Sequence, residues 1–302
     1  MSNRRPLAGL ATTGVQVAIG PFLVHVRSEL PLVHTYLETL YADFPLSSDA
    51  ESGHFAINLL AARGVRRWIR PQANLIVNGE RPFLPLPADL GGALFEWTIN
   101  YCVARDAHRF VAMHAAVVER HGRALVISGQ SGAGKSTLCA ALVLDGWRLL
   151  SDEFALVDPD TGMLSPLPRP VSLKNASIEI IRSRGRDSVF GPEGIDIENA
   201  RFVHMKPPAS SVRRASEPAV PAVVIFPRWR SGAATVLAPV RQAQVLLRLA
   251  DQSFNYNFLG VRGFEAIADL ARRVNAYELE YGDLDDVLPR LAGLFDAHAR
   301  PS

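Results

Sequence analysis

The sequence has few cysteines and no long apolar run. Among its 302 residues there are two cysteines, Cys102 and Cys139, and both lie within apolar stretches. Such placement favours buried free thiols in a reducing compartment over a disulfide framework. No apolar run reaches the length of a membrane span, and no secretion-type apolar segment follows the basic start. We therefore expect a cytoplasmic protein that has no membrane partner.

A strong excess of charge is also missing. The chain has 32 Lys and Arg against 30 Asp and Glu, a formal net charge of +2. Its basic residues form short, scattered clusters, which are more typical of solvated faces or phosphate contacts than of a polynucleotide track. Nucleic acid is therefore not an expected partner. A hydrophobic content of 48% and this length allow one large domain or two ordinary ones, with a sizeable core.

The most informative pattern that is present is the glycine-rich segment Gly129–Ser136, which reads G-x-x-x-x-G-K-S. A strand-like apolar run, Ala124–Ile127, leads into it, and a helix-like run, Thr137–Leu144, leads out. This is the setting that a P-loop requires. A plain glycine turn would need neither the lysine and hydroxyl nor these flanks. Backbone N–H groups of such a loop, together with the N-terminus of the next helix, attract phosphate oxygens.

The pattern therefore predicts ATP and Mg²⁺ as ligands. We expect Lys135 to reach the β- and γ-phosphates and the Ser136 hydroxyl to join the Mg²⁺ shell. The predicted ATP-binding residues are Gly129, Gln130, Ser131, Gly132, Ala133, Gly134, Lys135, Ser136 and Thr137.

A further absence distinguishes this chain from ordinary P-loop ATPases, which carry a second acid at the end of a distant apolar strand. Here the later strand-like run Val223–Phe226 is followed by proline and arginine. The acids that could serve are Asp152 and Glu153, and Asp152 lies only seventeen positions after Lys135. In addition, His114 lies within a strand-like run fifteen positions before the first glycine of the pattern. This spacing disfavours an ordinary ATPase.

These residues resemble the HPr kinase/phosphorylase family, in which a histidine precedes the P-loop by a β-hairpin and an aspartate pair follows its helix. His114, Gly129–Ser136 and Asp152 match that pattern in type and spacing. Essentially the whole chain is similar to the branch called HPr-kinase-related kinase A. The segments that carry this closer resemblance are Leu149–Glu153, Pro168–Asn175, His204–Pro208 and Ser253–Tyr256.

The resemblance implies an α/β (α+β) protein with an HPr kinase/PEP carboxykinase-like P-loop kinase domain. We expect this domain at residues 108–302 and a small N-terminal α+β domain at residues 1–107. Asn78-Gly79 within the smaller domain predicts a β-hairpin. Residues 180–221 are rich in Arg, Ser, Pro and Gly with little periodicity, so we expect a structureless, mobile loop there.

The chain departs from the family pattern at two points. Glu153 stands where the second aspartate is expected, and the glutamate- and glycine-containing signature that follows the aspartates in HPr kinases is missing. We therefore do not transfer three properties of the family to this chain: HPr as the substrate, the reverse phosphorylase reaction and one metal ligand.

The candidate catalytic residues are Asp152, His114 and Lys135. Asp152 is the candidate general base, because a carboxylate can accept the proton of a serine hydroxyl as phosphoryl transfer proceeds. Its alternative role is to position a metal without proton transfer. Glu153 either holds Mg²⁺ or pairs with an arginine. His114 either hydrogen-bonds the acid and tunes its basicity or is an ordinary core histidine.

Three cations are candidates for contacts with substrate or phosphate. Arg169 and Lys174 lie in a proline-containing segment that should be stiff and extended, and Lys206 precedes a proline pair. They could clamp the transferring phosphoryl group or a substrate carboxylate, or belong to solvated loops. Asn255 and Tyr256 either contact substrate or adenine or cap a helix.

Together these residues predict an ATP-dependent kinase that acts on a serine-type hydroxyl of a peptide or protein. Because relatives in the resembling branch include kinases of lasso-peptide precursors, the resemblance implies a ribosomal peptide precursor as acceptor. Free serine is the small-molecule alternative. A different class of function is a nucleotide-gated binding module that closes residues 180–221 over ATP without transfer. The family also forms oligomers, which implies a homo-oligomer.

Overall fold

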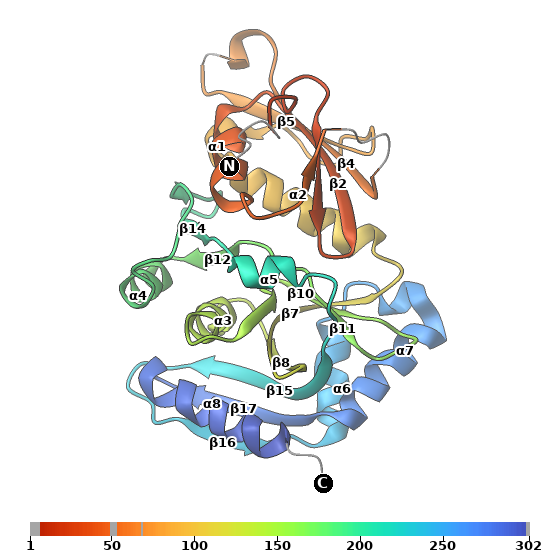
Figure 1. The fold of residues 1–302 in the computed structure, drawn as a ribbon, viewed down its shortest axis with the longest axis vertical. Helices are drawn as coiled ribbons and strands as arrows, with labels where there is room; N and C mark the ends of the chain where they lie inside the picture. The colour runs from red at the N-terminus through yellow and green to blue at the C-terminus, as the bar shows by residue number, and fades with distance from the viewer. Residues whose placement is uncertain (1–6, 49–52, 68, 300–302) are drawn as a thin grey trace. The chain divides into compact units, whose positions relative to one another are not determined.

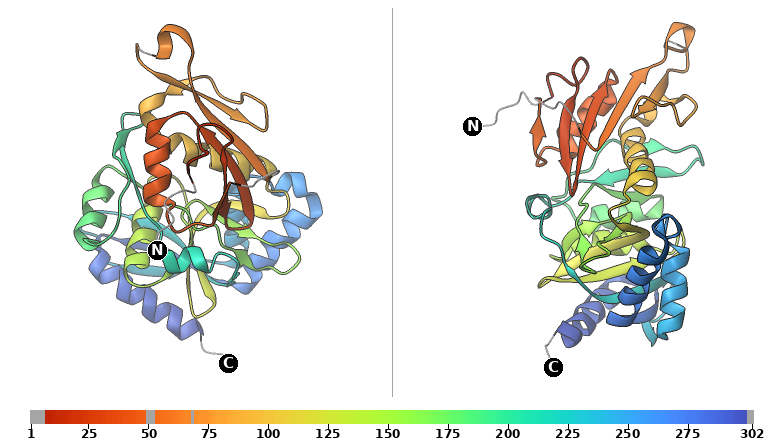
Figure 2. Two further views of the ribbon diagram at one scale, coloured as in Figure 1. Left: turned by 45° about the horizontal axis from the view of Figure 1, so that its top comes forward. Right: turned by 90° about the vertical axis from the view of Figure 1, so that its right-hand side faces the viewer.

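The computed structural model describes residues 7–48, 53–67 and 69–299, so the basic start lies outside the described residues. The chain forms two compact units (Figures 1 and 2). The first contains Met1–Val103, Ser172–Ile178 and Asp187–Lys206, and the second contains Ala104–Val171, Glu179–Arg186 and Pro207–Ser302. The first unit is therefore discontinuous, since two later segments return to it. Within the described residues, no helix combines the length and the apolar composition needed to cross a membrane.

The first unit is an α+β structure built on a six-stranded sheet of order β3-β1-β2-β4-β5-β6. These strands are β1 (Val15–Ile19), β2 (Phe22–Ser28), β3 (Leu46–Ser47), β4 (Phe55–Ala61), β5 (Gln72–Val77) and β6 (Leu86–Pro87). Its helices are α1 (Pro31–Leu40) and α2 (Gly92–Asp106), with 3₁₀ turns at Gly64–Arg67 and Ala88–Leu90. A smaller sheet has the order β12-β14-β13, formed by β12 (Val171–Lys174), β13 (Gly194–Ile195) and β14 (Arg201–Met205).

The predicted Asn78-Gly79 turn forms, but the hairpin that it starts is short. Both residues have positive φ, 50° and 86°, and Val77 bridges Glu80 across the turn. Regular pairing of β5 with β6 resumes only at Leu86 and Pro87. The turn signal is local and was correct, whereas the length of the returning strand depends on backbone partners that a local pattern does not specify.

The second unit is built on an eight-stranded mixed sheet of order β11-β10-β7-β8-β15-β17-β16, with β9 also paired to β7. Its strands are β7 (Val111–Arg120), β8 (Arg123–Ser128), β9 (Arg148–Ser151), β10 (Phe154–Val157), β11 (Leu164–Ser165), β15 (Val220–Trp229), β16 (Val236–Pro239) and β17 (Asn275–Tyr281). Its helices are α3 (Lys135–Leu144), α5 (Ala209–Arg213), α6 (Gln242–Asp251), α7 (Tyr256–Arg273) and α8 (Leu284–Ala299).

Helices cover both faces of this sheet. Alternate strand residues such as Met113, Val126 and Val224 pack with apolar residues of α6 and α7 in one buried cluster. Because successive strand residues point to opposite faces, the residues between them face the other side. There α3 contacts β7, β8 and β9, and α8 contacts β15. Figure 1 shows α8 crossing β15 and β17, and the right-hand view of Figure 2 shows α6 beside α7.

Residues 180–221 are not structureless, contrary to the expectation from composition. They include the end of α4 (Ala176–Arg184), then β13, β14, α5 and the start of β15. The low periodicity of the segment reflects short elements rather than a long loop. Each element is too brief to leave a clear pattern, and its regular structure depends on partners far away in the chain.

Strand β7 organises the part of the second unit that carries the predicted site. Its residues Ala115–Arg120 pair antiparallel with β8, so that Ala115 lies opposite Ser128. On its other side β7 pairs antiparallel with β9, where Val117 lies opposite Ser151, and with β10, where His114 lies opposite Phe154. The carboxyl ends of β8 and β9 therefore flank the same stretch of β7.

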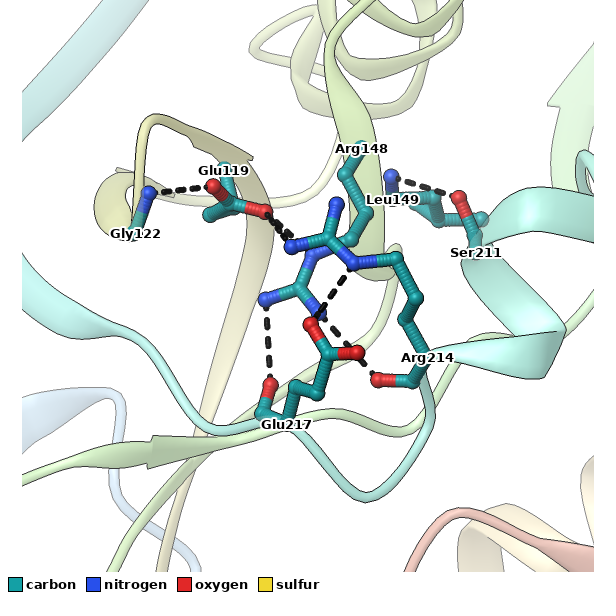
Figure 3. Close-up of polar contacts among 7 residues, drawn as sticks. All are labelled: Glu119, Gly122, Arg148, Leu149, Ser211, Arg214 and Glu217. Atoms are coloured by element: carbon teal, nitrogen blue, oxygen red, sulfur yellow. Dashed lines mark hydrogen bonds and ion pairs between the residues drawn. The ribbon is translucent and has the colours of Figure 1, made fainter.

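A buried charge network fixes β9 in place (Figure 3). The Arg148 guanidinium pairs with the Glu119 carboxylate of β7, and both side chains are almost fully buried. Arg148 also donates to the backbone oxygens of Arg214, at 3.1 Å, and Glu217, at 3.0 Å. The Leu149 N–H donates to Ser211 Oγ at 3.0 Å, which ties β9 to α5. The network thus positions the strand that leads to Asp152.

Loss of Arg148 should destabilise the protein strongly, because the buried Glu119 carboxylate would lose its closest cation and keep only the longer contact with Arg214, 3.5 Å from Nη2 to Oε2. We expect Arg148→Met to lower the free energy of unfolding by about 3–5 kcal/mol in urea titrations. The double variant Glu119→Leu/Arg148→Met should recover most of that loss. Arg290→Ala is the control, because its pair with Asp286 is exposed and should be worth about 0.5 kcal/mol. Equal losses for Arg148→Met and Arg290→Ala would contradict the network's role.

Candidate functional site

The glycine loop, residues 129–134, connects the end of β8 to the start of α3. Gly129, Gly132 and Gly134 have φ of 150°, 80° and 92°, so the loop uses backbone conformations that favour glycine. The Lys135 ammonium folds back onto the loop and donates to the oxygens of Gly129, at 2.6 Å, and Gln130, at 3.0 Å. The predicted strand–loop–helix arrangement is therefore present, with the lysine held over the loop.

Gly134 is also required by its surroundings. A Cβ atom at this position would lie 2.8 Å from Tyr281 Oη and 3.4 Å from Trp229 Cβ. The Tyr281 hydroxyl donates to the Gly134 oxygen at 3.5 Å. Burial raises the pKa of Tyr281, so this phenol stays neutral and able to donate. The ends of β15 and β17 thus support the loop from the side away from β7.

The two acids lie at a bend between β9 and β10. Ser151, the last residue of β9, accepts hydrogen bonds at its Oγ from the N–H groups of Glu153, at 3.3 Å, and Phe154, at 3.0 Å. This local hydroxyl bridge turns the chain, since a serine side chain can satisfy the N–H groups that a bend leaves without strand partners. Asp152 is buried, with 4% of its surface exposed, and Glu153 is part-buried.

His114 lies beside this bend. The Ala115 N–H donates to the backbone oxygen of Glu153 at 3.3 Å. The Nδ1 atom of His114 lies 3.6 Å from Oε2 of the Glu153 carboxylate. Burial lowers the pKa of His114, and the Lys135 charge lowers it further, while Glu153 opposes the shift. His114 is therefore predominantly neutral near pH 7. The structure brings the His114 ring to within 3.6 Å of the Glu153 carboxylate, although the sequence pattern emphasised Asp152.

The charges of the site act on one another. Burial lowers the pKa of Lys135, and the carboxylates of Glu153 and Asp152 oppose that shift. Burial together with the same two carboxylates raises the pKa of the Cys139 thiol, whose Sγ lies 4.0 Å from the Ser151 oxygen. Cys139 is consequently a neutral buried thiol, as its sequence context predicts. Lys135, Asp152 and Glu153 form one electrostatic unit.

An aromatic pair extends the site beyond His114. The Phe254 ring stands edge-on to His114 at 6.2 Å between centroids, and it lies 5.4 Å from the ring of Phe154. The buried Arg169 guanidinium lies over the ring of Phe154, 5.9 Å from its centroid. Arg169 therefore belongs with the acidic bend, as part of the extended chain between β11 and β12.

A pocket of about 340 Å³ lies against His114. The chain from the end of α6 to the start of α7 forms its other walls, through Asp251, Gln252, Ser253 and Phe254. This segment runs along β7 where β8 has turned away into the loop, with the His114 N–H donating to the Gln252 oxygen at 2.8 Å. The pocket thus opens directly beside the histidine.

The remaining candidates have structural partners. Lys174 and Lys206 belong to the first unit, where Lys174 Nζ lies 2.8 Å from Asp196 Oδ2 and Lys206 Nζ lies 2.8 Å from Asp43 Oδ2. The hydrogen bond from Lys174 lowers the pKa of Asp196. Arg169 belongs to the second unit, so the stiff segment that was expected to carry both cations spans the division between the units.

The Asn255 side chain is occupied by hydrogen bonds to the backbone. Its side chain is buried, with Nδ2 donating to the Phe110 oxygen and Oδ1 accepting from the Ala112 N–H, both at 2.9 Å. The amide thereby ties the start of α7 to β7. Tyr256 is the first residue of that helix, and its N–H donates to Ser253 Oγ at 3.3 Å. These contacts support the reading of this segment as a helix start.

Ser136 and Glu153 are the residues that could hold a Mg²⁺ ion that arrives with phosphate. Ser136 lies in the first turn of α3, and the Glu153 carboxylate acts on the neighbouring Lys135. Among the described residues, no group of three or more His, Cys, Asp or Glu gathers into a metal cage. Mg²⁺ usually takes one or two protein oxygens and completes its shell with phosphate and water, so a site of this kind does not need such a cage.

Four contributors to the site were missed by sequence reasoning. Ser151 shapes the acidic bend, Phe254 packs on His114, and Tyr281 and Trp229 border Gly134. Phe254 belongs to Ser253–Tyr256, one of the segments that carry the family resemblance, so the sequence did contain a signal for it. Nothing in the local pattern of β15 or β17 indicates contact with the loop, because that contact depends on which strands become neighbours.

Comparison with known proteins adds little to this geometry. No protein-family model matches the chain, and no curated protein matches it. Among solved structures, the HPr(Ser) kinase/phosphatase from Coxiella burnetii is similar over 61% of this chain and 96% of that chain, with 12% sequence identity and a TM-score of 0.28. A likeness this loose carries no argument about fold or function, which rest on the residues described above.

The tight fit at Gly134 predicts a difference between two glycines of the same loop. Alanine at either Gly132 or Gly134 should lower the free energy of unfolding by about 1–2 kcal/mol, because both residues have left-handed backbones. Gly134→Ala should lower it further, since its Cβ would meet Tyr281, whereas a Cβ at Gly132 meets nothing within 4 Å. Adding Tyr281→Phe should relieve Gly134→Ala in part. Equal effects of the two alanines in urea unfolding would contradict the predicted contact.

The lowered pKa of His114 predicts a pH dependence of stability. Its value in the folded state lies below 6.5, so below that pH the unfolded chain binds the proton more readily than the folded one. The wild type should therefore lose stability relative to His114→Gln as the pH falls from 7 to 5, measured by urea unfolding. His34→Gln, at an exposed site on α1, is the matched control. Parallel plots of the free energy of unfolding against pH for the wild type and His114→Gln would contradict the prediction.

Proposed function

We propose that this protein is an ATP-dependent kinase that transfers the γ-phosphoryl group to a serine-type hydroxyl of a peptide or protein. The observation that carries the proposal is the pairing of β7. Its register sets Ser128, before the glycine loop, opposite Ala115, and Ser151, before the two acids, opposite Val117, two positions further along the same strand. A phosphate-binding loop and a pair of carboxylates at one edge of a sheet are the two halves that phosphoryl transfer to a hydroxyl requires.

The donor half would be the glycine loop with Lys135 and Ser136. Backbone N–H groups of the loop and the N-terminus of α3 would hold the phosphates, with Lys135 exchanging its two loop carbonyls for phosphate oxygens. Bound Mg²⁺ would neutralise charge that develops on the phosphate oxygens. We further propose that the second unit has an HPr kinase/PEP carboxykinase-like fold, which the early position of Asp152 after the loop supports.

The acceptor half would be Asp152, next to Glu153 and the histidine that Glu153 contacts, His114. As the acceptor oxygen bonds to the γ-phosphorus, its proton passes to the Asp152 carboxylate and the bond to the β-phosphate oxygen breaks, releasing ADP. Neutral His114 adds no positive charge that would weaken a base, and its contact with Glu153 positions that carboxylate. Buried Arg169, whose guanidinium lies over the Phe154 ring, would balance charge near the transferred group.

The acceptor that we propose is a serine of a ribosomal peptide precursor. The class of acceptor is supported by the pocket beside His114, which is walled on one side by an exposed aromatic ring, Phe254, suited to a peptide side chain. The precursor identity rests on the resemblance of the Leu149–Glu153 and Pro168–Asn175 segments to the HPr-kinase-related kinase A branch, whose relatives include kinases of lasso-peptide precursors. Free serine is the small-molecule alternative, and the assay below includes it.

The test is transfer from ATP in the presence of Mg²⁺, read by mass spectrometry as the addition of one phosphoryl group. Acceptors are serine-containing precursor peptides, their serine-to-alanine counterparts and free serine. We expect Asp152→Asn to lower the transfer rate about 10²–10⁴-fold, because a general base is lost, while ATP affinity measured by calorimetry changes little. Asp145→Asn makes the same chemical change at the exposed C-terminal end of α3 and should have no effect.

The remaining outcomes separate the alternatives. Phosphorylation of free serine but of no peptide would replace the peptide acceptor with a small molecule. ATP binding without transfer to any acceptor would favour the nucleotide-gated binding module. Full turnover by Asp152→Asn would remove the base assignment and leave Asp152 as a residue that positions the metal.

A further inference from the structure

Trp229 is a large aromatic side chain that the core does not use. It is the last residue of β15, and 53% of its surface is exposed. The residues before it on the same strand, from Pro221 to Pro227, are all buried. An indole left this exposed at the end of a central strand contributes little to packing, whereas its π-face is well suited to a planar ligand.

The end of β15 runs along the glycine loop. β15 pairs parallel with β8, so both strands reach the same edge of the sheet. A Cβ built at Gly129 would lie 3.9 Å from Pro227 Cδ, and one built at Gly134 would lie 3.4 Å from Trp229 Cβ. Proline thus borders the start of the loop and tryptophan borders its end, where α3 begins. In Figure 1 the carboxyl end of β15 lies next to α3.

Trp229 also faces the side of the sheet on which the loop and α3 lie. Val224 and Phe226 belong to the cluster on the α6–α7 face, so alternation directs Pro227 and Trp229 to the opposite face. The pairing of Trp229 with Tyr281 in β17 agrees, because Tyr281 reaches Gly134 from the same face. By the same alternation, Arg228 and Arg230 point to the opposite face from Trp229. The surface beside the loop is therefore aromatic rather than cationic.

The two sides of the loop have different chemistry. His114 and the bend of Asp152 and Glu153 belong to the β7 side, and Glu153 and Asp152 act on Lys135 from there. The β15 side presents Trp229 and Tyr281. A nucleoside triphosphate whose γ-phosphate points to the acids must direct its nucleoside the opposite way, because the phosphates form one linear chain between the two ends.

We propose that Trp229 is the nucleobase platform of this site, stacking its indole against the base of the bound nucleoside triphosphate. The inference rests on the proposed function, since it requires the loop to hold the phosphates. Stacking of a base on tryptophan uses only the π-faces and needs no hydrogen-bond readout. Trp229 would therefore raise affinity for the nucleoside part of the ligand and leave the phosphate contacts to the loop.

The experiment compares two ligands that differ by the nucleoside. Calorimetry with the full chain and Mg²⁺ measures binding of the β,γ-imido analogue of ATP and of inorganic tripolyphosphate. Trp229→Ala should weaken binding of the analogue about tenfold and leave binding of tripolyphosphate unchanged, whereas Trp229→Phe should stay close to the wild type. Phe258→Ala removes another exposed aromatic ring, on α7, and should change neither affinity. Lys135→Ala should weaken both ligands.

Tryptophan fluorescence provides a second readout. The analogue should quench emission in the wild type and in Trp147→Phe, which removes a buried indole, but not in Trp229→Phe. Unchanged affinity of Trp229→Ala for the analogue would overturn the inference. So would an equal loss for both ligands, which would mean that Trp229 only shapes the loop. A wild type that binds neither ligand would instead refute the proposed function, and the platform with it.

Discussion

Strand β7 carries the three strand pairings on which the site depends. Its second half, residues 115–120, pairs with β8 on one side and with β9 on the other. Its first half, residues 111–114, pairs with β10. Hydrogen-bond register in a sheet is discrete, since a slip by one residue would turn every side chain to the opposite face. The glycine loop, the acidic bend and His114 are therefore held in fixed relation by backbone hydrogen bonds rather than by their own side-chain contacts.

That arrangement gathers charge in a partly buried place, which is unfavourable unless the charges compensate one another. Lys135 and His114 each lose solvation, and burial lowers the pKa of both. The carboxylates of Asp152 and Glu153 offset this for Lys135, while His114 responds by staying neutral. A cation kept charged next to a histidine kept neutral is a typical result of opposing electrostatic effects at a functional site. The buried pair of Arg148 and Glu119 follows the same rule at a structural position.

Sequence reasoning succeeded where the signal was local. It placed the strand-like run Ala124–Ile127 within β8 and the helix-like run Thr137–Leu144 within α3, because the apolar runs and the glycines between them lie within a few positions of one another. The candidates His114 and Glu153 lie together at the acidic bend that holds Asp152, and Arg169 lies over the neighbouring Phe154, while the roles of all four stay predictions. Sequence reasoning failed for residues 180–221, where short elements need distant partners, and it did not foresee that Lys174 and Arg169 would fall in different units.

The amino-acid sequence by itself determined the chemistry that is available. It specifies a lysine and a hydroxyl after a glycine loop, an acidic pair soon after the next helix, and a histidine one hairpin earlier. Tertiary structure alone decided which further residues join them. Phe254, Tyr281 and Trp229 reach the site through strand order and register. The physical reason is that pairing between strands far apart in the chain is set by burial of the whole sheet, which no local pattern records.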